Sequence, residues 1–115
     1  MIAEKVSEGG NYFKVGFVKT NKITELQITD ARSVEEITFP GKEGKPDVKK
    51  IQCEVSYKNQ GKEDPTSWTM NNKSRNILIE AWGKNTDDWV MKSIPITIGG
   101  SGDMEHVLVD SMRIA

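Results

Sequence analysis

The sequence predicts one mainly β domain of five strands, with a single helix between the third and the fourth strand. Two observations support this fold class. Apolar and polar residues alternate in several short runs, which is the period of a strand with one buried face. The stretch Asn72–Trp82 instead repeats its apolar residues at one and four places and contains no proline or glycine, which is the pattern of a one-sided helix.

Size and composition narrow the class of protein. The chain has 115 residues, enough to bury a core without disulfides or a metal, and its 36% hydrophobic and 29% charged residues are typical of a globular protein. It contains no run of about 18 apolar residues that could span a membrane. The amino-terminal stretch lacks the basic start and apolar core of a secretory signal. We therefore expect a cytoplasmic protein that makes no membrane contact.

The first part of the chain is polar. Residues 1–10 end in two glycines, so we expect a flexible arm here, followed by a single domain over residues 11–115. Within that domain, Phe13, Val15 and Phe17 alternate with other residues. This alternation predicts a short extended segment packed on one side.

The next stretch predicts a hairpin. Residues 23–34, in which Leu26 and Ile28 alternate with polar residues, predict a long half-buried strand. Residues 35–47 contain two prolines and two glycines, which indicates a loop. The clearest strand of the chain follows, and its core face consists of Ile51, Cys53, Val55 and Tyr57.

Residues 59–65 predict a turn, and residues 67–70 predict a short third strand. At the start of the helix, Asn71 or Asn72 can supply the side-chain oxygen that caps the first free amides. Gly83 stands where a left-handed residue would end the helix. A helix of about three turns is marginal alone in water, so its apolar face must pack against the sheet.

After the helix, residues 83–88 predict a polar turn, and Trp89 opens a strand with three inward-facing isoleucines. Pro95 within this strand indicates an edge position or a bulge, because proline cannot donate to a ladder. Residues 99–103 predict a flexible loop, and a final strand covers residues 106–114.

Five antiparallel strands with a helix between the third and the fourth is the order of the OB-fold, a small and partly open barrel. In that fold the helix plugs one end of the barrel, and an amphipathic helix that carries Trp82 suits this place. We therefore predict a five-stranded OB-like barrel. An α+β sandwich with one covering helix is the alternative.

The helix and the segments after it carry a recognisable pattern. Its parts are Asn72-Lys73-Ser74, then Trp82-Gly83, then Thr86-Asp87-Asp88-Trp89-Val90 with Lys92, and the ending Ser111-Met112-Arg113-Ile114. The pattern is similar to that of a family of small, largely uncharacterised phage and prophage proteins: Leu-Asn-Lys-Thr-Asn, a helix, Gly-Asp-Asp-Thr-Asp-Asp-Trp-Ile-Gly-Lys and a strand ending in Ile-Arg-Val. The resemblance covers residues 12–115, with Ser74 in place of Thr and Met91 in place of Gly. It implies an OB-like domain in a phage or mobile-element setting, without a settled activity or catalytic residues.

The residue types that carry catalysis are sparse. Cys53 is the only cysteine and lies in an alternating strand, so we expect a buried apolar side chain and not a catalytic thiol. His106 is the only histidine, so a triad or a multi-histidine zinc site would depend on it alone. Asp87 and Asp88 can bind a hard cation in principle, but turn chemistry explains their position. We predict a protein that is not an enzyme, with no catalytic residue, metal or cofactor.

Charge limits how nucleic acid could bind. The formal net charge is −1, so the chain has no global positive field and any such binding must be local. OB-folds bind single strands across the second and third strands and the adjoining loops, where this chain has lysines. We therefore predict binding of single-stranded DNA or RNA. The candidate residues are Tyr12, Phe39, Lys42, Lys45, Lys49, Lys50, Gln52 and Lys58.

Two observations keep a second function open. Four acidic residues lie among these lysines, namely Glu43, Asp47, Glu54 and Glu63. The alternation also buries Tyr57 and Trp68 rather than exposing them for base stacking. The alternative is a protein-interaction or assembly module of a phage complex, which would bind a phage or host protein with the same sheet face.

Overall fold

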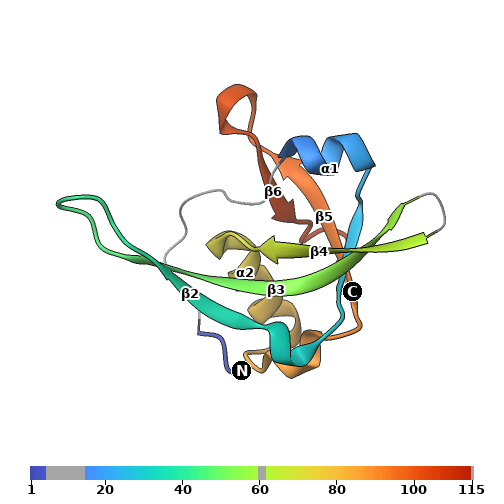
Figure 1. Cartoon of the computed structure of the whole chain (residues 1–115), viewed down its shortest axis with the longest axis horizontal. Coiled ribbons are helices and arrows are strands. Elements are labelled where there is room, and N and C mark those ends of the chain that lie inside the picture. The colour runs from blue at the N-terminus through green and yellow to red at the C-terminus, as the bar shows by residue number, and fades with distance from the viewer. Residues whose placement is uncertain (5–14, 60–61, 115) are drawn as a thin grey trace.

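The computed structural model describes residues 1–4, 15–59 and 62–114. Within these residues the protein is mainly β, with one antiparallel sheet of six strands and two α-helices (Figure 1). The helices and strands are α1 (Val15–Asn21), β1 (Glu25–Ile28), β2 (Glu35–Phe39), β3 (Val48–Asn59), β4 (Lys62–Thr69), α2 (Asn72–Trp82), β5 (Ser93–Gly99) and β6 (His106–Val109). Three short 3-10 turns are η1 (Ala31–Ser33), η2 (Thr86–Trp89) and η3 (Gly102–Met104).

β3 is the central strand of the sheet and pairs with β1, β2 and β4. The strand order is β2-β3-β1-β5-β6, and β4 pairs with the other side of β3. β1 and β2 both run antiparallel to β3, with Gln27 opposite Ser56 in β1 and Glu35 opposite Gln52 in β2. They are consecutive pieces of one extended run that η1 interrupts, so a single long strand is replaced by two short ones.

The prediction of one strand over residues 23–34 and a loop over residues 35–47 is therefore wrong at its boundary. The chain leaves the ladder at η1, where the Asp30 carboxylate accepts a hydrogen bond from the backbone N–H of Arg32 at 2.9 Å. It then re-enters the ladder as β2, which occupies the first five residues of the predicted loop. Pairing with β3, a non-local interaction, decides this boundary.

The predicted core face of β3 is confirmed. Ile51, Cys53, Val55 and Tyr57 are all buried. Burial raises the pKa of the Cys53 thiol to about 12, so this side chain is a neutral, apolar residue at physiological pH.

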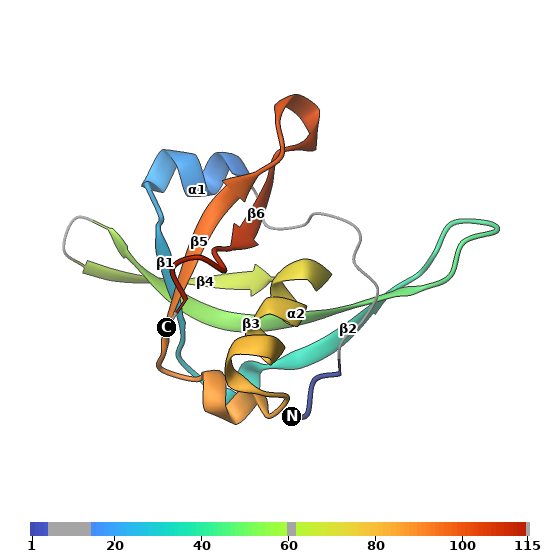
Figure 2. The ribbon, with the colours of Figure 1, turned by 180° about the vertical axis from the view of Figure 1, so that it is seen from behind.

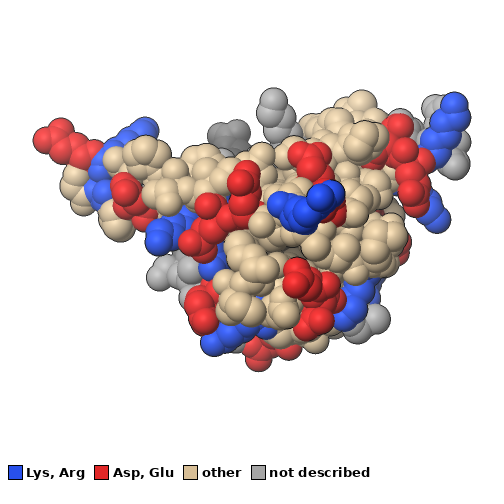
Figure 3. Space-filling model, turned by 60° about the horizontal axis from the view of Figure 1, so that its bottom comes forward, with Lys and Arg blue, Asp and Glu red and all other residues tan. Residues whose placement is uncertain are grey.

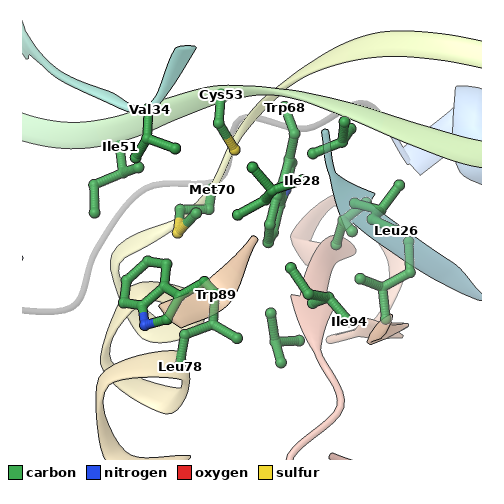
Figure 4. Close-up of a cluster of buried hydrophobic side chains, with 14 of the residues drawn as sticks. Leu26, Ile28, Val34, Ile51, Cys53, Trp68, Met70, Leu78, Trp89 and Ile94 are labelled. Carbon is green, nitrogen blue, oxygen red and sulfur yellow. The ribbon is translucent and has the colours of Figure 1, made fainter. Parts of the chain in front are cut away.

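The predicted helix is confirmed with its boundaries. The Asn71 side chain accepts a hydrogen bond from the backbone N–H of Ser74 at 2.9 Å, and Gly83 ends the helix at a φ of 90°. Leu78 faces Met70 and Trp89 in the core (Figure 4). Trp89 lies in η2 and not in a strand, and its indole N–H donates to the Gly83 carbonyl oxygen at 2.9 Å.

The sheet is open, so the predicted five-stranded barrel is not closed. Among the described residues, no ladder joins β4 to β6. α2 instead covers β6, as the view from behind shows (Figure 2). The Asn71 amide donates to the Val107 carbonyl oxygen at 3.2 Å, and the Ser74 hydroxyl oxygen accepts from the Val109 N–H at 2.9 Å. Side chains of the helix thus occupy hydrogen-bonding positions that a neighbouring strand would fill.

The prediction of a single helix is wrong, because Val15–Asn21 forms α1 where an extended segment was expected. Val15 and Val18 are three residues apart and face the core together as helix neighbours. Phe17 packs edge-on against Tyr57, with ring centroids 5.5 Å apart. The rest of the expected segment, including Phe13, lies outside the described residues.

The last two strands also differ from expectation. β6 ends at Val109 and not at residue 114, because the Asp110 carboxylate turns the chain by pairing with Arg113 at 2.7 Å. β5 lies between β1 and β6, so Pro95 is not in an edge strand. Its carbonyl oxygen accepts from the Asp110 N–H at 2.8 Å, just beyond the end of the β5–β6 ladder, where a missing N–H costs little.

The first four residues pack against the α2–η2 region. Ala3 is fully buried and its N–H donates to the Lys84 carbonyl oxygen at 2.7 Å. Arg75 donates from its Nε to the Glu4 carbonyl oxygen at 2.7 Å. The rest of the predicted arm, residues 5–10, lies outside the described residues. In the described part of the chain, no helix has the length and apolar character needed to cross a membrane.

Candidate nucleic-acid interface

A projecting hairpin carries the largest group of predicted site residues. It consists of β2, the loop of residues 40–47 and the first half of β3, and it extends away from the body along the longest axis of the molecule (Figure 1). We call it the β2–β3 arm. Lys42 and Lys45 are exposed at its tip, which is closed by the Asp47 carboxylate accepting from the Gly41 N–H at 2.8 Å.

Gly41 is required by this loop. A side chain at this position would collide with the backbone oxygens of Lys45 and Pro46. Gly44 adopts a φ of 81°, which also favours glycine. The tip is therefore a defined turn that holds its two lysines in solvent.

Strand alternation separates the next predicted residues. Lys49 is exposed and points to the same side of the strand as Ile51, whereas Gln52 points to the opposite side. The Gln52 amide donates to the Ser67 hydroxyl at 2.9 Å across the β3–β4 pair. These two predicted residues therefore do not act on one face.

Lys50 contradicts the prediction of an accessible side chain. It is fully buried although it points to the outer side of the strand, opposite Ile37 in the ladder. Desolvation lowers the pKa of its ammonium group. Lys50 is thus part of the interior at this point of the sheet, and we remove it from the phosphate-binding group.

Of the two aromatic candidates, Phe39 lies within the described residues. Phe39 is half-buried and pairs with Val48 at the base of the tip, so part of its ring is accessible. Tyr12 lies outside the described residues. Tyr57 and Trp68 are buried, as predicted.

Lys58 lies far from the arm. It is nine residues from Lys49 along β3, which corresponds to roughly 30 Å in an extended strand. The predicted residues therefore form two groups at opposite ends of β3 and not one patch. On the lower face of the molecule, basic and acidic side chains are interspersed and form no continuous positive band (Figure 3).

A pocket beside Lys58 is a second candidate site that the sequence did not reveal. It has a volume of about 260 Å³ and lies between the end of α1, β1 and the β3–β4 hairpin. Its charged lining residues are Lys22, Glu25, Lys58 and Glu63. These residues are up to 41 positions apart in the chain (63 − 22), so only the packing of α1, β1 and β4 around β3 brings them together.

The residues of the recognisable pattern have structural roles in this fold. Thr86 is buried and its hydroxyl donates to the Met1 carbonyl oxygen at 3.0 Å. Lys92 stacks its ammonium group over the Trp82 ring, 4.9 Å from the centroid. Met91 adopts a φ of 65°, a backbone conformation that favours glycine.

The two features weighed as chemical sites are also structural. The Asn85 side chain accepts from the Asp87 N–H at 3.1 Å, so an Asx turn organises the two aspartates. His106 packs its ring against Gly99 and contacts the Met104 carbonyl oxygen through Nδ1 at 2.9 Å. Within the described residues, no group of three or more metal-ligating side chains is found.

Comparison of the chain with protein-family models, with curated proteins and with solved structures found no match.

Proposed function

We propose that this protein is a non-catalytic module that binds single-stranded nucleic acid and that the β2–β3 arm makes the main phosphate contacts. The observation that carries the proposal is the projection of Lys42, Lys45 and Lys49 into solvent on one hairpin. A flexible single strand can follow such a hairpin, because its phosphates need only a row of accessible cations.

The order of the strands supports this proposal. If β1 and β2 count as one interrupted strand, the order β, β, β, α, β, β is that of an OB-like domain. The tip of the arm then corresponds to the loop between the first and second strands, which flanks bound strands in OB-folds. The resemblance of the pattern at residues 72–92 favours a phage or mobile-element setting.

The test is fluorescence anisotropy of a labelled 20-nucleotide single strand at roughly 50 and 200 mM salt. Three phosphate contacts predict a slope of about −2 in log affinity against log salt, and hence a roughly 20-fold loss of affinity over this range. The double variant Lys42→Glu/Lys45→Glu should bind about tenfold more weakly at 50 mM.

Lys73→Glu is the matched control, because Lys73 is an exposed lysine that belongs to α2 and not to the arm. It should change the affinity less than threefold. Absence of binding at micromolar protein, or binding that does not weaken with salt, contradicts the proposal.

An interaction with a protein is the second candidate, and the open sheet favours it. Within the described residues the ladder with β3 is the one that β2 forms, so β2 is an edge strand of the described sheet, and edge strands are where a partner can add a strand. The arm also carries Glu43 and Asp47 beside its lysines, a mixture that suits a protein surface. This function predicts a complex that survives 200 mM salt and no salt-dependent binding to oligonucleotides.

A further inference from the structure

The pocket beside Lys58 arises because two paired strands diverge. The β1–β3 ladder consists of two pairs, Gln27 with Ser56 and Ile28 with Val55. Beyond Gln27, β1 leads toward α1 while β3 continues into its hairpin with β4 (Figure 1). The space between them is the pocket of about 260 Å³.

Main-chain groups line this space. The Thr29 N–H donates to the Glu54 carbonyl oxygen, so Thr29 and Glu54 form a hydrogen-bonded pair. In an antiparallel ladder such pairs occur at every second residue, so Gln27 and Ser56 form the next one. The next such pair after Gln27 and Ser56 would join Glu25 to Lys58, but the ladder ends before it. The N–H and C=O groups of Glu25 and Lys58 therefore face the pocket without pairing to each other.

Charges of both signs surround the pocket. The ammonium groups of Lys22 and Lys58 and the carboxylates of Glu25 and Glu63 are all exposed at its rim. In the described part of the chain, none of these four side chains forms an ion pair. Four unpaired charges around one hollow can satisfy a ligand that has both an anionic group and hydrogen-bond donors.

The floor of the pocket combines polar and apolar groups. Ser93, Gln27 and Ser56 lie side by side across β5, β1 and β3, because Gln27 is in register with both serines. The Gln27 amide N–H donates to the Met91 carbonyl oxygen at 2.7 Å, which fixes this side chain. Buried Leu26 and Tyr57 add apolar surface, as a pocket for a flat ring requires.

We propose that this pocket holds one nucleotide of the bound strand, a proposal that rests on the proposed function and names the base class it selects. The phosphate lies between Lys22 and Lys58, and the carboxylates of Glu25 and Glu63 accept hydrogen bonds from the exocyclic amine of the base. The volume, slightly below the 300–1,000 Å³ typical of pockets for drug-sized ligands, suits a ligand of this size.

The geometry predicts a preference among bases. Cytosine and adenine carry an exocyclic amine, at C4 and C6, that a carboxylate can accept from, whereas thymine and uracil carry the carbonyl oxygen O4 at the place of the cytosine amine. A thymine would bring its O4 toward the two carboxylates and offer only its N3–H as a donor, between two carbonyl oxygens that the carboxylates repel. The protein should therefore bind oligo-dC about fivefold or more tightly than oligo-dT of the same length.

The test measures the ratio of the affinities for oligo-dC and oligo-dT, the dC:dT ratio, by anisotropy for the full chain and for the double variant Glu25→Gln/Glu63→Gln. The variant should bring the dC:dT ratio close to one. Glu43→Gln, which removes an exposed carboxylate from the arm tip, is the matched control and should keep the ratio. A ratio near one for the unmodified protein, or a ratio that the double variant leaves unchanged, overturns the pocket assignment while salt-dependent binding keeps the proposed function.

If neither oligonucleotide binds, the pocket is tested by itself. Backbone amide shifts of the protein are followed by NMR during titration with dCMP and, separately, dTMP at millimolar concentration. Shifts at Glu25 and Lys58 that are larger with dCMP support the nucleotide pocket even though the proposed function has failed. Equal shifts with both nucleotides, or none at these residues, overturn it.

Discussion

The α2–η2 region and the β2–β3 arm use polar residues in opposite ways. In the α2–η2 region, Ser74, Arg75 and Thr86 are buried, and each bonds to a distant part of the chain. In the arm, the side chains of Lys42 and Lys45 are exposed, and within the described residues neither forms an ion pair. The comparison teaches that the buried polar residues of the α2–η2 region hold the fold together, whereas the exposed lysines of the arm contribute little to it.

Arg75 should give the largest effect on stability. Its guanidinium is buried and lies 2.8 Å from the Glu36 carboxylate, and it also binds the Glu4 carbonyl oxygen. Arg75→Ala removes both contacts and leaves a cavity, so the free energy of unfolding should fall by about 3 kcal/mol. Arg75→Met keeps most of the side-chain volume, so its loss in the free energy of unfolding should be smaller. Equal losses for the two variants, measured by urea denaturation, would show that packing is not part of the role.

Substitution of Ser74 should have the second-largest effect on the free energy of unfolding. Ser74→Ala leaves the Val109 N–H of β6 buried without an acceptor, which should cost roughly 1–3 kcal/mol. The adjacent Lys73→Ala is exposed and should change stability by less than about 0.5 kcal/mol. Hydrogen exchange at the Val109 amide should accelerate in Ser74→Ala alone. Unchanged protection of that amide would refute the contact.

Met91 is a position where a substitution should raise the stability of the protein. It adopts a φ of 65°, where a residue with a side chain is strained by about 1–2 kcal/mol. Substitution by glycine removes this strain, but part of the gain is lost because glycine gives the unfolded chain more conformational freedom. Met91→Gly should therefore raise the free energy of unfolding by about 0.5–1 kcal/mol. Met104→Gly replaces an exposed methionine at an ordinary φ and should stabilise nothing. The measurement is the thermal unfolding midpoint, which should rise in Met91→Gly and not in Met104→Gly.

The arm should give the smallest effect on stability. Lys42→Glu/Lys45→Glu should change the free energy of unfolding by less than about 0.5 kcal/mol, because neither side chain packs against the body. The same variant should lose about tenfold in affinity for a single strand. A large loss of stability here would remove the distinction between the two regions.

Elements defined by neighbouring residues could be predicted from the sequence. Asn71 and Gly83 mark the ends of α2 by local hydrogen bonding and backbone geometry. The alternation from Ile51 to Tyr57 likewise places one face of β3 in the core, because successive side chains must point to opposite sides. These signals depend on the chain within a few residues.

Elements that depend on distant partners could not be predicted. Val15 and Phe17 fit an alternating strand, but Val15 and Val18 fit a helix turn equally well, and the contact between Phe17 and Tyr57 belongs to the tertiary structure. β2 is a strand only because β3 lies beside it. The burial of Lys50 and the pocket between Glu25 and Lys58 also follow from three-dimensional packing, which no local pattern contains.

The covering of β6 by α2 links the two elements in the folding reaction. The contacts from Asn71 to Val107 and from Ser74 to Val109 span 36 and 35 residues, and both start from the first turn of the helix. The Val107 carbonyl and the Val109 N–H meet these side chains only when that turn has formed. We therefore expect β6 to become ordered together with the first turn of α2 and not independently of it.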